Sequence, residues 1–265
     1  MKTFRWNGIM LYRGDFVPSI DLPWHYIPVW IGITTPLLYL AAALLGTGLV
    51  LRQLVQNHWR LWRAEGGMQD LLFLALLLGP LGAVIFLHSV LYDGWRQLYF
   101  VYPALLLLGL RGWVALARWR PRWARWPSAL YGATALCLLV TAGQMVHDHP
   151  LQNVYFNLLA GNDVAHRYEM DYWGVGYRAD LEYIVRHDSR RRIKVVESAP
   201  EPAKFNALML PRADRDRLVF VDKADSADYV VTNYRWHPQD FEFPFEVHNT
   251  KVGGVRVHSV FKRGW

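Results

Sequence analysis

Four long apolar runs in the first half of this 265-residue chain limit its possible folds more than any other feature. Three of them contain no charged residue, and the remaining run contains one, Arg111. A membrane-spanning helix needs about 20 predominantly apolar residues. We therefore predict four transmembrane helices, with a kink at Pro36 and with Arg111 extending to the membrane interface. The predicted spans are residues 27–51, 71–91, 98–117 and 128–146.

The net charge of +7 lies entirely in the apolar half of the chain. Residues 1–147 carry 12 Lys and Arg against 5 Asp and Glu, whereas residues 148–265 carry 17 of each. A basic balance can indicate nucleic-acid binding. Here the basic residues flank the apolar runs, as they do beside membrane helices, so we expect no nucleic-acid partner.

The arginines also predict an orientation. The loops after the first and third runs hold seven arginines, and Arg111 near the end of the third run is an eighth, against two acids, Glu65 and Asp70. Loops rich in Lys and Arg stay on the cytoplasmic side. Residues 1–26, the turn at 88–103 and everything after residue 147 are then predicted to face outward. The expected location is the inner (plasma) membrane, with an extracytoplasmic C-terminal domain.

Residues 148–265 have the pattern of a small soluble α/β domain. Helical spacing is seen at 178–187 and 202–210, and β-branched runs alternate with these segments. Strands alternating with helices favour a partly parallel sheet. The expected strands are 193–197, 217–221 and 229–232, followed by a hairpin of 245–249 and 254–262. The predicted organisation is an outward loop (1–26), an α-helical polytopic membrane region (27–147) and this domain (148–265).

The polar turn at residues 88–103, HSVLYDGWRQLYFVYP, lies between the second and third apolar runs. It is crowded with Trp and Tyr, which gather where the bilayer meets water. Two interpretations remain open. His88, Tyr92 and Arg96 could surround the phosphate of an anionic lipid, because the guanidinium offers a planar fork of donors. Alternatively, Arg96 pairs with Asp93 and the turn is an interfacial anchor.

Other chemistries have weaker support. His147, Asp148 and His149 are adjacent, but neighbouring side chains on an extended chain point in opposite directions. A polar cap at the membrane exit explains them better than a metal site. No HExxH or G-x-S-x-G pattern occurs, and the single cysteine, Cys137, lies in an apolar run. We therefore predict no metal site in this chain, no cofactor and no serine or cysteine hydrolase, and the metal dependence of the whole protein stays open.

Several stretches together resemble a known family. They are WNGIMLYRGDFVPSIDLPWHYIPVWIGITTP, HSVLYDGWRQLYFVYP, HPLQNVYFNLLAG, YEMDYWGVGYRADLEYI and YVVTNYRW. They resemble bacterial members of the GT-C glycosyltransferases, and are similar to the dolichyl-phosphate-mannose protein mannosyltransferases and the lipid A aminoarabinose transferase. The Y-D-G-W-R stretch at 92–96 and the D-Y-W-G stretch at 171–174 carry most of this resemblance.

The resemblance implies a membrane enzyme that transfers a sugar from a polyprenyl-phosphate carrier to an acceptor on the outer face. The family's catalytic carboxylate follows its first membrane helix, and no segment of this chain corresponds to that region. We therefore expect the chain to represent the C-terminal portion, with no catalytic residue of its own and no activity alone.

For the chain's own residues, we expect Arg96 to contact the lipid phosphate, with His88 and Tyr92 in support. Asp171 and Trp173 are candidates for closing the site from the outer domain, the alternative being a structural corner. The rival hypothesis for the whole protein is a non-catalytic membrane anchor that presents a binding domain outward.

Overall fold

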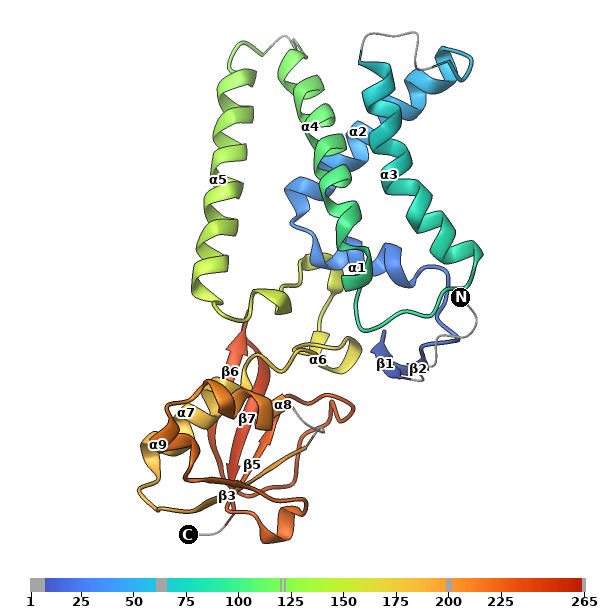
Figure 1. The fold of residues 1–265 in the computed structure, drawn as a ribbon. Coiled ribbons are helices and arrows are strands. Elements are labelled where there is room, and N and C mark those ends of the chain that lie inside the picture. Colours follow the sequence, from blue (N-terminus) through green and yellow to red (C-terminus); the bar gives the residue numbers. More distant parts are fainter. Residues whose placement is uncertain (1–7, 61–65, 120, 122, 199–201, 264–265) are drawn as a thin grey trace. The chain divides into compact units, whose positions relative to one another are not determined.

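A computed structural model describes residues 8–60, 66–119, 121, 123–198 and 202–263 of the chain (Figure 1). These residues form two compact units. The helical unit comprises Met1–Gly8, Pro18–His147 and Phe156–Ala160, and the sheet unit comprises Ile9–Val17, Asp148–Tyr155 and Gly161–Trp265. Four residues of the predicted cytoplasmic loops, Arg63, Glu65, Arg120 and Arg122, lie outside the described residues.

The first apolar run is broken in two, where the sequence predicted one kinked span over 27–51. Helix α1 covers Tyr26–Thr34, and helix α2 covers Leu37–Gln56. Pro36 lacks the N–H that would continue α1, and a residue before proline is pushed out of the helical region. Thr35 is extended accordingly, with φ −98° and ψ 133°. The membrane-length helix of this run is therefore α2 alone.

Asn157, far along the chain, satisfies the carbonyl groups that this break leaves without helical partners. Its side-chain amide donates to the carbonyl oxygens of Gly32 and Thr35 at 2.7 and 2.6 Å. Its backbone N–H donates to Ile33 at 2.8 Å. Since an unpaired buried carbonyl is costly, this contact stabilises the break and joins residues 156–160 to the helical unit.

The other three runs form α3 (Gly67–Phe86), α4 (Tyr102–Arg118) and α5 (Trp126–His147), with a 3-10 helix η2 (Arg96–Val101) leading into α4. Together with α2, these make four helices long and apolar enough to cross a membrane, which confirms that part of the prediction. The second span ends earlier than predicted. Residues 87–91 leave the helix and belong to the following loop.

Arg111 forms an ion pair between two of the long helices. Its Nε donates to Asp70 Oδ2 of α3 at 3.1 Å, and its predicted position at the membrane interface stays a prediction. Asp70 lies in the first turn of α3, where a carboxylate also meets the positive end of the helix dipole. The pair links α3 to α4 and neutralises both charges.

Helices α2 and α4 approach each other through glycines. A Cβ atom on Gly46 would overlap the carbonyl oxygen of Leu108, and one on Gly112 would overlap that of Ala42. Small residues allow such close approach of backbones in membrane helices. The two helices thus pack backbone against backbone at this crossing.

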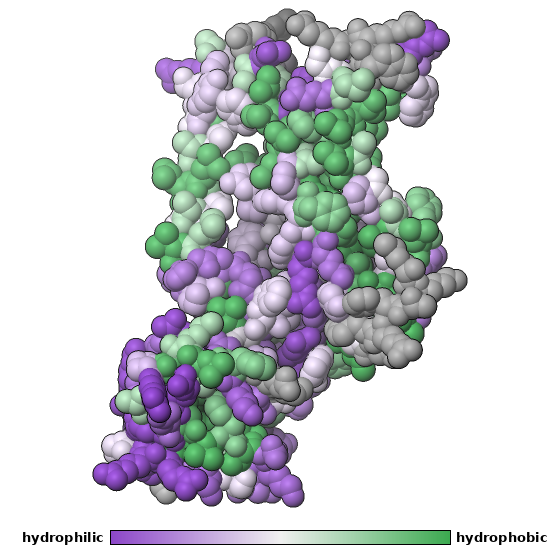
Figure 2. All heavy atoms as spheres, in the orientation of Figure 1, coloured by the Kyte–Doolittle hydropathy of each residue, from purple (hydrophilic) through white to green (hydrophobic). Residues whose placement is uncertain are grey.

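Most of the apolar surface of these helices has no protein cover. At most 33% of any membrane-length segment is buried within the protein, and none of the α5 segment is. Figure 2 shows hydrophobic residues gathered along the helical unit and hydrophilic residues over much of the sheet unit. Exposed apolar faces of this extent mark surfaces that contact a membrane or another protein.

The sheet unit contains one five-stranded mixed sheet in the order β4-β3-β5-β7-β6. Strand β3 pairs in parallel with β4 and β5, while β7 runs antiparallel to both β5 and β6. The predicted strands, their partly parallel arrangement and the hairpin turning at Gly253 and Gly254 are all confirmed. The strands are β3 (Ile193–Glu197), β4 (Leu218–Phe220), β5 (Tyr229–Thr232), β6 (Glu246–Val252) and β7 (Val255–Lys262).

Helix α7 (Tyr177–His187) covers one face of this sheet. Its apolar residues recur at helical spacing, and Leu181 and Ile184 are fully buried against Val195, Val231 and Val260 of the strands. Helix α8 (Pro202–Asn206) and the 3-10 helix η5 (Ala207–Met209) extend this core. The remaining short helices are η3 (Gln152–Val154), η4 (Leu158–Ala160), α6 (Val164–Arg167), α9 (Arg212–Arg215) and η6 (Ala224–Ser226).

A hairpin of β1 (Ile9–Tyr12) and β2 (Asp15–Pro18) lies within the segment predicted as a loop. Its turn, Arg13-Gly14, has both residues at positive φ, the geometry of tight hairpin turns. The hairpin joins the sheet unit through residues distant in sequence. Leu11 N–H donates to Glu169 at 3.1 Å, and Gly14 N–H donates to the Arg167 carbonyl at 3.1 Å.

The glycine crossing yields a test of the helix packing. Gly46→Ala should lower the free energy of unfolding by about 1–3 kcal/mol, because the new methyl group forces two backbones apart. Gly48→Ala is the matched control on the same helix, because a Cβ atom at that position would have no neighbouring atom within 4 Å. Thermal unfolding of the purified chain in detergent measures both. Equal stability of the two variants would contradict the packing.

Candidate functional site

The loop after α3 begins with a strained histidine. The N–H of His88 donates to the Ile85 carbonyl and that of Ser89 to the Val84 carbonyl, the paired bonds of a Schellman cap. Such a cap places its C′ residue, here His88, in the left-handed region that glycine favours. His88 adopts φ +46° there. His58 ends α2 in the same way, so this backbone geometry alone identifies no ligand.

The rest of the loop is fastened to α1. Gly94 N–H donates to the hydroxyl of Tyr26 at 3.1 Å. The indole N–H of Trp95 donates to Thr34 Oγ1 at 2.9 Å. Tyr26, Asp93 and Trp95 are buried, so the loop forms a fixed wall at this end of the helical unit.

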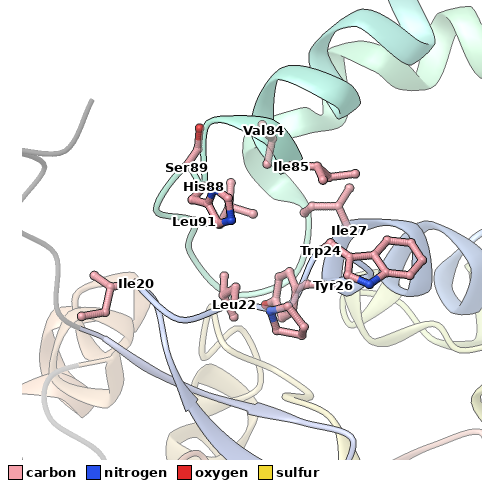
Figure 3. Close-up of a pocket in the computed structure, with 11 residues that line it drawn as sticks. Ile20, Leu22, Trp24, Tyr26, Ile27, Val84, Ile85, His88, Ser89 and Leu91 are labelled. Carbon is pink, nitrogen blue, oxygen red and sulfur yellow. The ribbon is translucent and has the colours of Figure 1, made fainter.

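A cavity of about 240 Å³ opens between this loop, α1 and the end of α3 (Figure 3). Figure 3 shows the imidazole of His88 directed toward Leu91 and the cavity interior. The wall is mainly apolar, and His88, Ser89 and the exposed ring of Trp24 supply the polar edges. The lining residues are Ile20, Leu22, Pro23, Trp24, Tyr26, Ile27, Val84, Ile85, His88, Ser89 and Leu91.

A second, larger cavity of about 540 Å³ shares Val84, Ser89 and Leu91 with the first. Its other walls are apolar residues of α3 and η2, together with Gln97. The two cavities thus border the same short stretch of loop. Their mixed lining, apolar with a few polar groups, is typical of small-molecule sites.

The structure brings Tyr92 and Arg96 together. The Arg96 guanidinium lies 4.8 Å from the centre of the Tyr92 ring, and its NH2 donates to the buried Asp93 carboxylate at 3.4 Å. The Arg96 side chain is 21% exposed. Neither Tyr92 nor Arg96 lines either of the two cavities. Of the three predicted phosphate-binding residues, His88 alone lines either of these two cavities.

Sequence reasoning missed the contribution of residues 20–27. Trp24 and Tyr26 line the first cavity, and Tyr26 also holds the loop through Gly94. The available signal was the pair of interfacial aromatics directly before the first apolar run. Their position beside His88 depends on the break at Pro36, which a single-span prediction does not contain.

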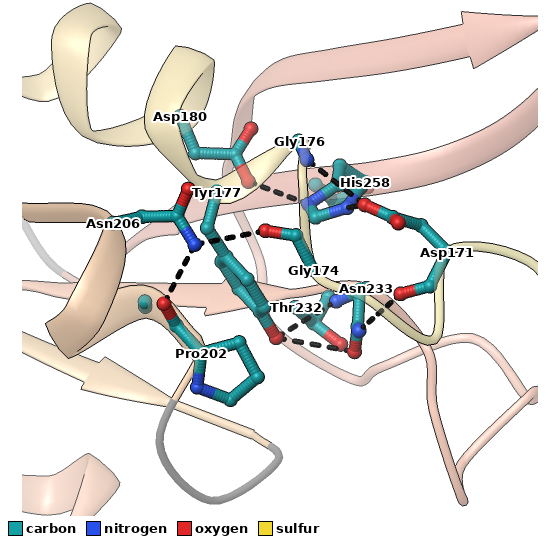
Figure 4. Close-up of polar contacts among 12 residues, drawn as sticks. Asp171, Gly174, Gly176, Tyr177, Asp180, Pro202, Asn206, Thr232, Asn233 and His258 are labelled. Atoms are coloured by element: carbon teal, nitrogen blue, oxygen red, sulfur yellow. Dashed lines mark hydrogen bonds and ion pairs between the residues drawn. The ribbon is translucent and has the colours of Figure 1, made fainter. Parts of the chain in front are cut away.

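Asp171 belongs to a buried cluster of the sheet unit (Figure 4). Its Oδ2 accepts from Gly176 N–H at 2.9 Å and lies 3.0 Å from His258 Nε2. The opposite ring nitrogen, Nδ1, lies 2.8 Å from Asp180 Oδ2. Asp171 is 1% exposed and His258 0%, so the carboxylate contacts no open cavity. This burial supports the structural-corner alternative.

The cluster carries charge. Both imidazole nitrogens face a carboxylate, so both donate and the ring is an imidazolium. Burial alone would lower the pKa of His258, but the charge of Asp180 and the hydrogen bonds to both carboxylates raise it to about 9. Burial alone would raise the pKa of Asp171, yet hydrogen bonds and the charge of His258 hold it below its ordinary value. A buried cation thus ties β7 to α7.

The D-Y-W-G-V-G-Y stretch is shaped around this cluster. A Cβ on Gly176 would lie 2.5 Å from the His258 ring, and one on Gly174 would lie 2.5 Å from Pro202 Cβ. Gly174 also has φ +65°, and Tyr177 exchanges hydrogen bonds with Asn233. Trp173 lies on the outside of the corner, 53% exposed. This stretch of the family resemblance therefore has a packing explanation.

No group of three or more His, Cys, Asp or Glu residues that could hold a metal ion occurs in the described part of the chain. His149 Nδ1 lies 3.0 Å from the amide nitrogen of Gln152, and His147 ends α5. This arrangement agrees with the polar-cap interpretation.

Comparisons with known proteins leave the family open. No protein-family model matches the chain, and neither the curated proteins nor the solved structures contain a significant match. The resemblance to GT-C glycosyltransferases stays a prediction carried by the residues quoted above.

The buried imidazolium predicts a pH-dependent stability. Its folded pKa of about 9 exceeds the ordinary 6.5, so its stabilising effect is complete below pH 6.5 and is lost as the pH rises through 9. In that window the free energy of unfolding should fall by about 1.4 kcal/mol per pH unit. Pulse proteolysis of the sheet unit in urea, using the whole chain in detergent, measures this fall.

His258→Gln should lower the free energy of unfolding by about 3–5 kcal/mol, because two buried carboxylates lose their cation, and should flatten this pH dependence. His187→Gln, at the exposed end of α7, is the control. It should change the free energy of unfolding by about 0.5 kcal/mol or less. An unchanged pH profile in His258→Gln would show that His258 is neutral in the folded state.

Proposed function

We propose that this chain is the C-terminal portion of an inner-membrane glycosyltransferase that uses a polyprenyl-phosphate-linked sugar. In this proposal α2, α3, α4 and α5 cross the bilayer and the sheet unit is extracytoplasmic. The donor's lipid phosphate binds at the loop after α3. The acceptor, which receives the sugar on the outer face, is a protein, a lipid or a glycan.

The cavity beside His88 is the observation that carries this proposal. It lies at the end of a membrane-length helix, where lipid headgroups lie in a bilayer. An apolar wall with a few polar residues at one edge suits an amphiphile whose tail is apolar and whose head is charged. His88 and Ser89 supply polar groups at that edge.

In the proposed reaction the acceptor hydroxyl attacks the anomeric carbon, and the bond from that carbon to the phosphate oxygen breaks. The leaving polyprenyl phosphate gains negative charge, which cations beside it stabilise. Arg96 supplies the cation, and His88 and Tyr92 supply hydrogen bonds. We assign the base that takes the acceptor's proton to no residue of this chain, since Asp93 is buried against Arg96.

A second candidate function has one specific observation in its favour. Arg96 already has Asp93 as its ion-pair partner and Tyr92 as its stacking partner. An anchor that only holds the sheet unit at the membrane would need this pairing and no ligand. Binding measurements separate the two candidates.

Arg96→Ala should weaken binding of a polyprenyl phosphate to the purified chain in nanodiscs by about 1.5–3 kcal/mol, the scale of a hydrogen bond to a charged group. Arg96→Lys should restore part of this, because lysine keeps the charge and lacks the fork. Arg118→Ala, at the opposite end of α4, is the control. Unchanged affinity in a correctly inserted Arg96→Ala protein would favour the anchor.

His88→Gly separates binding from folding in the same assay. Glycine relieves the left-handed strain, so stability should stay equal or rise by up to about 1 kcal/mol, while the affinity for polyprenyl phosphate falls. His58→Gly relieves the same strain at the end of α2 and should leave affinity unchanged. A His88→Gly protein that binds as the parent does would exclude His88 from the site.

A further inference from the structure

A second strained segment follows strand β5 in the sheet unit. Tyr234 and Trp236 have φ +59° and +61°, a left-handed conformation that bulky side chains rarely adopt. Local bonds hold it in place. Tyr234 N–H donates to Thr232 Oγ1 at 3.0 Å, and the Tyr234 hydroxyl lies 2.7 Å from Ser259 Oγ. The strain fixes the direction of the side chains on either side of Arg235.

The turn after β5 brings an aromatic ring, Trp236, and a cation, Arg235, side by side. The Arg235 guanidinium lies 4.6 Å from the centre of the Trp236 ring, and Arg235 NH1 donates to the Tyr172 carbonyl at 3.3 Å. The Trp236 indole N–H donates to the Ile9 carbonyl at 3.0 Å. Trp236 is 42% exposed and Ile9 49%. We call Ile9, Arg235 and Trp236 the Trp236 patch.

The patch includes one of the places where the chain passes between the two units. Ile9 follows Gly8, which is the end of a helical-unit segment, and the hairpin returns to that unit at Pro18. Both ends of the hairpin are thus one peptide bond from the unit with the membrane-length helices. Because Trp236 binds the Ile9 backbone, it stays within a few residues of both junctions.

We propose that the Trp236 patch rests in the phospholipid headgroup layer and holds the sheet unit on the membrane surface. Tryptophan is enriched at this level because its ring is apolar and its N–H is polar. The guanidinium beside it adds a positive charge, which attracts anionic lipid headgroups. The inference rests on the bilayer placement of α2 to α5 in the proposed function, and not on sugar transfer.

Photo-crosslinking tests the contact directly. The whole chain, with a benzophenone amino acid in place of Trp236, is reconstituted in vesicles of phosphatidylethanolamine and phosphatidylglycerol, irradiated and analysed by mass spectrometry. Phospholipid adducts are expected at position 236. The control places the same group at Phe205 on α8, which is more exposed than Trp236 and does not belong to the Trp236 patch. Equal lipid labelling at both positions, or none at 236, would overturn the proposal.

Arg235→Gln in the labelled chain should reduce the lipid adduct about fivefold, the effect of one cation near an anionic surface. An undiminished yield would remove Arg235 from the patch. In the chain without substitutions, the amides of 233–237 should exchange more slowly in lipid nanodiscs than in a lipid-free polymer, and equal exchange would overturn the proposal. Lipid labelling at 236 in a chain that fails to bind polyprenyl phosphate would reject the proposed function and support this inference.

Discussion

The apolar surface of the four long helices is the constraint on which the rest of the structure depends. Within the described chain no residue of α5 is buried, and at most 33% of the residues in the best apolar window of any other long helix are buried. Helices with such surfaces are stable where lipid replaces water around them. In the proposed bilayer placement, charges between the helices need partners, and Arg111 pairs with Asp70 between α3 and α4.

The sequence predicted the parts of this fold that depend on local pattern. Apolar runs of about 20 residues and the period of the β-branched strands are sufficient to identify four long helices and one mixed sheet. Features that depend on partners distant in sequence were missed. The break at Pro36 was predicted only as a kink, because its stabilising partner, Asn157, lies more than 100 residues away. The hairpin at 9–18 was missed because its partners, Arg167 and Glu169, are equally distant.

In the candidate site too, the sequence predicted what depends on local pattern and missed what depends on distant partners. Sequence reasoning identified His88, Tyr92 and Arg96 as one cluster, and the fold brings the last two together while His88 lines a cavity with Trp24 and Tyr26. Asp171 attracted attention because of its D-Y-W-G context, yet its partners are His258 and Gly176. Neither residue type nor spacing reveals that a histidine 87 residues away lies against it. Two of the motifs that resemble glycosyltransferases thus have different physical roles, one at a cavity and one in a buried corner.

The buried corner and the Trp236 patch have complementary roles in the sheet unit. His258 joins β7 to α7 through two carboxylates, which fixes the core and the start of α7. The strained turn after β5 leaves its aromatic ring at the surface. In the proposal above, Trp236 and Arg235 contact lipid headgroups while the buried corner keeps the sheet unit rigid.

Placement of the helices in a bilayer is the central claim, and the chain contains one native probe for it. Cys137 is the single cysteine, and it is exposed near the middle of α5. A nitroxide label on Cys137 in reconstituted vesicles can be examined by power-saturation EPR. We predict high accessibility to oxygen, which concentrates in the bilayer core, and exclusion of a polar nickel chelate. Ready collision of the label with the nickel chelate would place α5 in water and contradict the membrane assignment.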